Sequence, residues 1–113
     1  MTKYVNLTPH KVVVYKNDKP HLVIEPSGQI ARLKVKSRLI GTTEDGIEIV
    51  QNTFGEIENL PEPQKNTIYI VSLAVAQVLG GTRSDIVAPD TSPQSVVRDN
   101  EGRIIGVKRF CRF

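Results

Sequence analysis

The alternation of hydrophobic and polar positions predicts one short helix in a chain otherwise made of strands. Residues 67–71 are mostly β-branched or aromatic, Ser72 is a favourable helix N-cap, and residues 73–79 are apolar with one exception. The glycine pair at 80–81 then ends the helix. A helix that is apolar on nearly every side has to be buried on nearly every side. We therefore expect a sheet to wrap around it and a loop to follow over residues 82–89.

Further stretches of the chain have the period-2 alternation and the turn residues of β-hairpins. The sequence predicts a single domain over residues 1–113, of the α+β class and mainly β. We expect a small antiparallel sheet or a partly open barrel of hairpins wrapped around the buried helix at about 72–79. The expected hairpins pair residues 11–15 with 21–25, 29–39 with 47–51, and 95–98 with 103–110.

The strand expected over residues 29–39 carries four cations on one face. Arg32, Lys34, Lys36 and Arg38 occupy alternate positions. Residues 41–64 contain six acids and no Lys or Arg, so we expect pairing with the returning strand to neutralise much of this face. The alternative is a surface that contacts phosphates, but no aromatic side chain lies between the cations to stack on bases. Nucleic acid is therefore the less favoured partner.

The formal net charge of +3 is concentrated at the C-terminal end of the chain. Residues 1–97 hold ten cations and ten acids, whereas residues 98–113 hold five cations and two acids. The C-terminal segment is therefore either a surface that attracts an anion or a solvated strand face. Its cations are Arg98, Arg103, Lys108, Arg109 and Arg112.

Cysteine content and hydropathy predict a cytoplasmic protein. The single Cys111 can form no internal disulfide, as is typical of a reducing compartment, and we expect it in the core or at a strand edge. No apolar run approaches the ~18 residues that span a bilayer. The N-terminal residues enter a strand pattern without the features of a signal peptide. We expect no contact with a membrane.

The familiar catalytic and cofactor motifs are missing from the sequence. It has no phosphate-binding or dinucleotide-binding glycine pattern, no cysteine pair for zinc and no Gly-x-Ser-x-Gly elbow. His10 and His21 are separated by a predicted hairpin turn and can face each other, but two imidazoles without a third ligand form a poor metal site. The sequence predicts neither a metal site nor a cofactor.

Two groups of polar residues are candidates for a site. Asn6, Thr8 and His10 lie where the first strand is interrupted, and they either converge on a ligand or close a local turn. Arg83 and Asp85 lie two apart in the loop after the helix. They either anchor a sugar or phosphate or bond to each other and hold the loop.

Several short motifs are spread over nearly the whole chain. They are Asn6-Leu-Thr-Pro-His10, Pro26-Ser-Gly-Gln-Ile-Ala-Arg32, Tyr69-Ile-Val-Ser72, Arg83-Ser-Asp-Ile-Val-Ala-Pro89 and Val97-Arg-Asp-Asn-Glu-Gly102. As a set they resemble a group of small proteins of phages, prophages and bacterial genomes without an established activity. The resemblance implies a phage or mobile-element setting, and thus the cytoplasm of a host bacterium. It also implies that the polar motif residues matter for binding or for folding: Asn6, Thr8, His10, Ser27, Arg32, Ser72, Arg83, Asp85 and Arg98.

The leading functional hypothesis is a small binding protein that sequesters an anionic, nucleotide-like molecule, by analogy with phage proteins that capture host-defence signals. The alternatives are a phosphoester or nucleotide hydrolase with His10 as general base, and an inhibitor that binds a host protein through a basic surface. A homo-oligomer is expected, since a subunit interface deepens the shallow pockets of a small chain. The expected ligand-binding residues are Asn6, Thr8, His10, Arg32, Ser72, Arg83, Asp85, Arg98 and Arg109.

Overall fold

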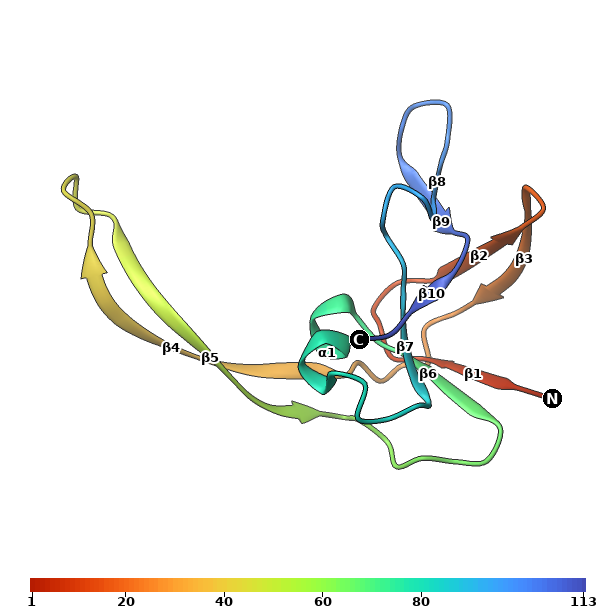
Figure 1. The fold of residues 1–113 in the computed structure, drawn as a ribbon, viewed down its shortest axis with the longest axis horizontal. Coiled ribbons are helices and arrows are strands. Elements are labelled where there is room, and N and C mark those ends of the chain that lie inside the picture. Colours follow the sequence, from red (N-terminus) through yellow and green to blue (C-terminus); the bar gives the residue numbers. More distant parts are fainter.

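The computed structural model describes all residues, Met1–Phe113, and contains one helix and ten strands. Figure 1 shows a compact body from which one long hairpin projects. The elements in chain order are β1 (Lys3–Asn6), β2 (Val12–Lys16), β3 (Lys19–Ile24), β4 (Arg32–Thr42), β5 (Glu48–Glu58), β6 (Thr67–Ile70), α1 (Leu73–Leu79), β7 (Ile86–Pro89), β8 (Val96–Arg98), β9 (Ile104–Val107) and β10 (Phe110–Cys111).

The central sheet has the strand order β1-β6-β7-β10 and is mixed. β1, β6 and β7 run parallel, and β10 pairs antiparallel with β7. The sequence predicts a loop over residues 82–89, but Ile86–Pro89 is β7, an inner strand of this sheet. That prediction was wrong because a four-residue strand buried on both faces has no alternation to reveal it. The unit β6–α1–β7 is therefore a parallel crossover rather than a strand, a helix and a loop.

The central sheet separates two hydrophobic cores. Tyr69, Val71 and Ile86 point to one face, where they pack in a cluster with residues of α1. Ile70 and Val87 point to the other face, where they pack against residues of a second sheet with the order β3-β2-β9-β8. Because successive residues of a strand point to opposite faces, the short strands β6 and β7 contribute to both cores. The body is thus a helix, a mixed sheet and a second sheet in layers.

Local sequence signals set the ends of α1 as predicted. The Ser72 hydroxyl oxygen accepts a hydrogen bond from the Val75 N–H at 3.3 Å, and Gly80 adopts a left-handed conformation with φ 58°. The helix is buried on one side only, because Gln77 and Val78 face solvent. The fold class, α+β and mainly β, is confirmed, but the sheets do not wrap around the helix and no barrel closes. With seven residues, α1 is too short to cross a bilayer.

β4 and β5 form a two-stranded hairpin of residues 32–58, which we call the arm. The hairpin extends away from the body (Figure 1), and the radius of gyration is 16.9 Å. A compact chain of this length has a radius of gyration of about 13 Å. Gly46 at the arm's tip has φ 86°, a conformation that glycine adopts readily, and it lies between the two segments predicted to pair. The arm is therefore the feature that makes the molecule elongated.

The cations of β4 lie on one face of the arm, as predicted, but they are not neutralised. None of Arg32, Lys34, Lys36 and Arg38 forms an ion pair with β5. Arg32 is opposite Glu58 in the strand register without bonding to it, and Arg38 instead donates to the Gln51 side chain at 3.2 Å. The predicted cross-strand charge pairing was wrong, because two long side chains in water gain little from being held together.

Gly106 in β9 has no room for a side chain. A Cβ atom at this position would lie 2.6 Å from the Tyr15 ring and 2.8 Å from the Val13 carbonyl oxygen. We expect Gly106→Ala to lower the free energy of unfolding by about 1–3 kcal/mol. Gly41→Ala is the matched control, since its Cβ meets no atom within 4 Å. Denaturant unfolding of both variants tests this, and equal stability would contradict the packing described.

Candidate functional site

A groove lies between residues of β2 and β9. These two parallel strands pair at a single position, Val14 with Val107. The groove between them has a volume of about 550 Å³ and extends to the start of α1. This volume lies within the range of small-molecule sites. The groove is therefore the first candidate for a functional site on the body.

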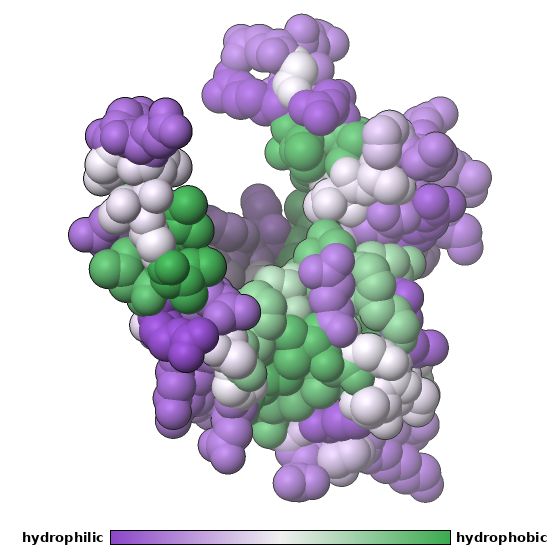
Figure 2. All heavy atoms as spheres, turned by 60° about the vertical axis from the view of Figure 1, so that its left-hand side comes forward, coloured by the Kyte–Doolittle hydropathy of each residue, from purple (hydrophilic) through white to green (hydrophobic).

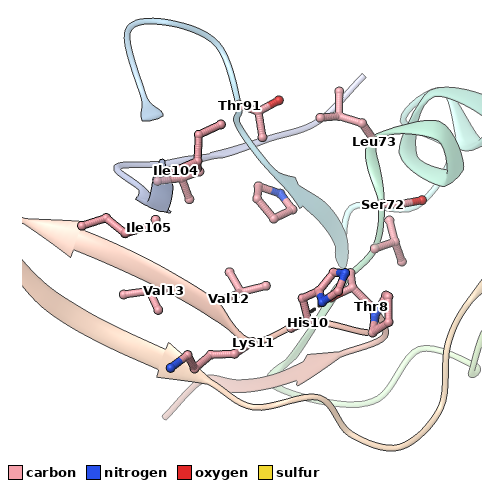
Figure 3. Close-up of a pocket in the computed structure, with 15 residues that line it drawn as sticks. Thr8, His10, Lys11, Val12, Val13, Ser72, Leu73, Thr91, Ile104 and Ile105 are labelled. Carbon is pink, nitrogen blue, oxygen red and sulfur yellow. Dashed lines mark hydrogen bonds between the residues drawn. The ribbon is translucent and has the colours of Figure 1, made fainter. Parts of the chain in front are cut away.

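The groove has an aliphatic wall and a polar end. Val12, Val13, Leu73, Ile104 and Ile105 form much of the wall. The polar side chains along the groove are Thr8, His10, Lys11, Ser72 and Thr91, and no acidic side chain lines it. In Figure 3, His10 and Thr8 lie at the end near Ser72, and Ile104 and Ile105 lie at the opposite end. The site therefore combines an apolar surface with a few polar side chains, of which Lys11 is the one cation.

The Asn6 side chain holds the loop that carries His10. Asn6 is only 1% exposed, and its amide nitrogen donates to the carbonyl oxygens of His10 at 2.7 Å and of Ile24 at 3.0 Å. Its amide oxygen accepts from the Thr8 N–H at 2.9 Å and lies 2.6 Å from the Thr8 hydroxyl. These bonds satisfy a fully buried amide. Asn6 therefore positions the groove residues and does not face a ligand.

Arg83 and Asp85 bind each other. The guanidinium contacts both carboxylate oxygens, at 3.0 and 2.6 Å, donates to the Pro61 carbonyl at 2.9 Å and lies over the Tyr69 ring. Hydrogen bonding from Arg83 lowers the pKa of Asp85, and the same bond raises the pKa of Arg83. Neither residue lines the groove. The pair holds the loop after α1 against the connector that precedes β6.

The other predicted cations are also distant from the groove. Arg98 donates to the Gly102 carbonyl within its own hairpin, and Arg109 forms an ion pair with Asp90. Arg32 lies on the arm. Of the nine residues predicted to bind a ligand, the structure brings Thr8, His10 and Ser72 to the groove and places Asn6 behind them. The Ser72 hydroxyl already caps α1.

Sequence reasoning missed the wall of the groove and its one lysine. Ile104 and Ile105 are adjacent in β9 and yet 52% and 42% exposed. Two successive aliphatic residues in a short strand cannot both face one core, so their adjacency was a signal of a second apolar surface. Nothing in the sequence pointed to Lys11, because a single lysine before a strand is common on protein surfaces.

The structure contains no group of three His, Cys, Asp or Glu side chains arranged to hold a metal ion. Comparison of the chain with protein-family models, curated proteins and solved structures gave no match. Functional inference therefore rests on the geometry of the groove and of the arm.

Asn6→Ala tests the structural role of the buried amide. The substitution leaves the His10 and Ile24 carbonyl oxygens without their donor, so we expect the free energy of unfolding to fall by about 2–4 kcal/mol. Thr8→Ala keeps the backbone bond to Asn6 and should cost less than about 1 kcal/mol. Denaturant unfolding separates the two variants, and an Asn6→Ala protein as stable as Thr8→Ala would refute the assignment.

Asp85→Asn tests the ion pair through its pH dependence. Because the pKa of Asp85 is lower in the folded than in the unfolded chain, the pair stabilises the fold at neutral pH, and this stabilisation is lost as the pH falls through the folded-state pKa. We expect the variant to be less stable than wild type by about 1–2 kcal/mol at neutral pH. The difference should shrink below about pH 4, where wild type loses the same interaction. Urea unfolding over a pH series measures it, and a constant difference would contradict the pairing.

Proposed function

We propose that the protein is a binding module that holds an anionic, nucleotide-like molecule in the groove. One observation carries the proposal: the groove is apolar along its wall, is lined by His10 and Lys11, and has no acidic lining residue. A ligand with a flat apolar part and an anionic group is complementary to that arrangement. The flat part packs against Ile104, Ile105 and Leu73, and the anion lies near Lys11 and His10.

The residues proposed to bind the anion differ from the arginines that the sequence predicted. Arg83, Arg98 and Arg109 donate to groups within the protein, so they are not the ligand's partners in this proposal. Lys11 and His10 take that role because they are exposed and line the groove. An ammonium group without an acidic neighbour in the site attracts an anion at long range and binds it at short range.

The proposed biological role is sequestration of a host-defence signal in the cytoplasm of a host bacterium. It combines the groove chemistry with the phage setting implied by the sequence motifs. Hydrolysis by His10 remains an alternative, although no side chain forms a hydrogen bond that would orient its imidazole as a general base. The unpaired cations of the arm keep open the second alternative, an inhibitor that contacts a host protein.

A panel of nucleotides and signalling dinucleotides tests the proposal. We expect at least one member to raise the melting temperature and to be released intact when the protein is denatured by heat. Lys11→Ala should weaken its binding roughly tenfold, because the anion loses a charged partner. Lys19→Ala is the matched control, since it removes the same charge from β3 at a position outside the groove.

Each outcome of the panel bears on one hypothesis. Recovery of a chemically altered ligand would support the hydrolase. The absence of any thermal shift would contradict both ligand hypotheses and favour the protein inhibitor. Equal weakening by Lys11→Ala and Lys19→Ala would place the anion outside the groove.

A further inference from the structure

The arm has one apolar face and one cationic face. Its cross-strand register places Val35 opposite Phe54 and Leu39 opposite Val50, and these two pairs lie on the same face because Val35 and Leu39 are four residues apart in β4. The pair Ser37 and Asn52 lies between them. The cations of β4 occupy the intervening positions and thus the opposite face. The arm is therefore a strongly amphipathic ribbon.

The apolar face begins in the core and then continues without cover. At the base of the arm, Leu33 and Ile57 pack against the core cluster beside α1. Further out, Val35 is 48% exposed, Phe54 59%, Leu39 56% and Val50 48%. Figure 2 shows a band of hydrophobic side chains midway along the arm, between its polar tip and the body. Nothing in the chain itself covers this part of the face.

The size of the exposed surface indicates an interface. The large apolar side chains exposed on this face of the arm are Val35, Leu39, Val50 and Phe54. Together they expose roughly 400 Å², which lies within the range of the largest apolar patch on a typical monomer, a patch that is often functional. A two-stranded hairpin without a second layer is only marginally stable in water. The arm thus needs a partner that supplies the second layer.

We propose that a second copy of this chain covers the apolar face, with the two arms packed face to face and antiparallel about a two-fold axis. The axis passes near the Ser37–Asn52 pair. This arrangement places Val35 and Phe54 of each arm against Leu39 and Val50 of the other, so the face is complementary to itself. The Ser37 hydroxyl donates to the Asn52 side-chain oxygen at 2.6 Å, so the polar pair at the centre is already bonded within each chain.

Charge favours this orientation over a parallel one. Glu44, Asp45 and Glu48 lie at the tip of the arm, and no Lys or Arg occurs between residues 39 and 64. Parallel arms would bring two such acidic tips together, whereas antiparallel arms place them at opposite ends of the interface. The cationic faces of both arms remain in water on the outside of the dimer. A second copy therefore satisfies both the apolar and the charge pattern of the arm.

The dimer is independent of the proposed ligand site. No arm residue lines the groove, so arm pairing leaves both grooves of the dimer open. The proposal goes beyond the binding function, because a failure of ligand binding would not affect dimerisation. Loss of dimerisation would likewise leave each groove intact.

Cross-linking of engineered cysteines tests the geometry. In a Cys111→Ser background, we expect Ser37→Cys to be joined into a covalent dimer by a short bismaleimide, because facing sheets lie ~10 Å apart and position 37 lies near the two-fold axis. Thr43→Cys at the tip is the matched control and should not be cross-linked, since the two tips lie at opposite ends. Cross-linking at position 43 but not at position 37 would overturn the antiparallel arrangement.

Sedimentation of the intact protein tests the interface itself. We expect wild type to sediment at twice the chain mass of 12.6 kDa and Phe54→Ser to sediment as a monomer. Lys36→Ser on the opposite face should remain dimeric. Circular dichroism checks that Phe54→Ser keeps its body folded, which we expect because Phe54 is exposed in the single chain. A monomeric wild type, or a Phe54→Ser protein that remains dimeric, would overturn the proposal.

Discussion

The buried amide of Asn6 is the interaction on which the arrangement of the body depends. It bonds the carbonyl oxygens of Ile24 at the end of β3 and His10 before β2, and its oxygen accepts the Thr8 N–H. The backbone carbonyl of Asn6 also accepts from the Ser27 N–H. One residue thus connects β1, the break that follows it and the segment that leads to the arm. Its amide nitrogen and oxygen are both hydrogen-bonded, which explains why a polar residue can be fully buried here.

The structure separates two kinds of exposed apolar surface. The groove on the body is a concave surface beside a histidine and a lysine, which suits a small molecule with an anionic group. The arm is an extended ribbon with one exposed apolar face, which suits a second ribbon of the same kind. Both arise because neither surface can be buried by so short a chain, and each of the two proposals assigns one surface to one kind of partner.

Elements defined by neighbouring residues were predictable, and elements defined by distant ones were not. The hairpin turns, the Ser72 cap and the Gly80 stop follow from local backbone chemistry, and the structure has them where expected. β7, which pairs with β6 across the intervening helix, was missed, and so was the parallel pairing of β1 with β6, which joins Lys3 to Thr67. The same distinction between local and distant signals applies to the candidate site. Thr8 and His10 were found as residues at a strand break, but the aliphatic wall formed by β2 and β9 has no local signature.

The sequence by itself determined the strand-rich composition, the ends of the helix and the two-faced pattern of β4, because each depends on side-chain period or on the conformational preferences of a few adjacent residues. It did not predict that the β4–β5 hairpin projects from the body as an arm. Only the tertiary structure decided which polar residues remain free. Arg83 forms an ion pair with Asp85, and the Asn6 amide nitrogen donates to two backbone carbonyl oxygens. The cations of β4, by contrast, form no ion pair. Whether a charged or amide group binds a ligand depends on the partners that folding brings within hydrogen-bonding distance, and no local pattern specifies them.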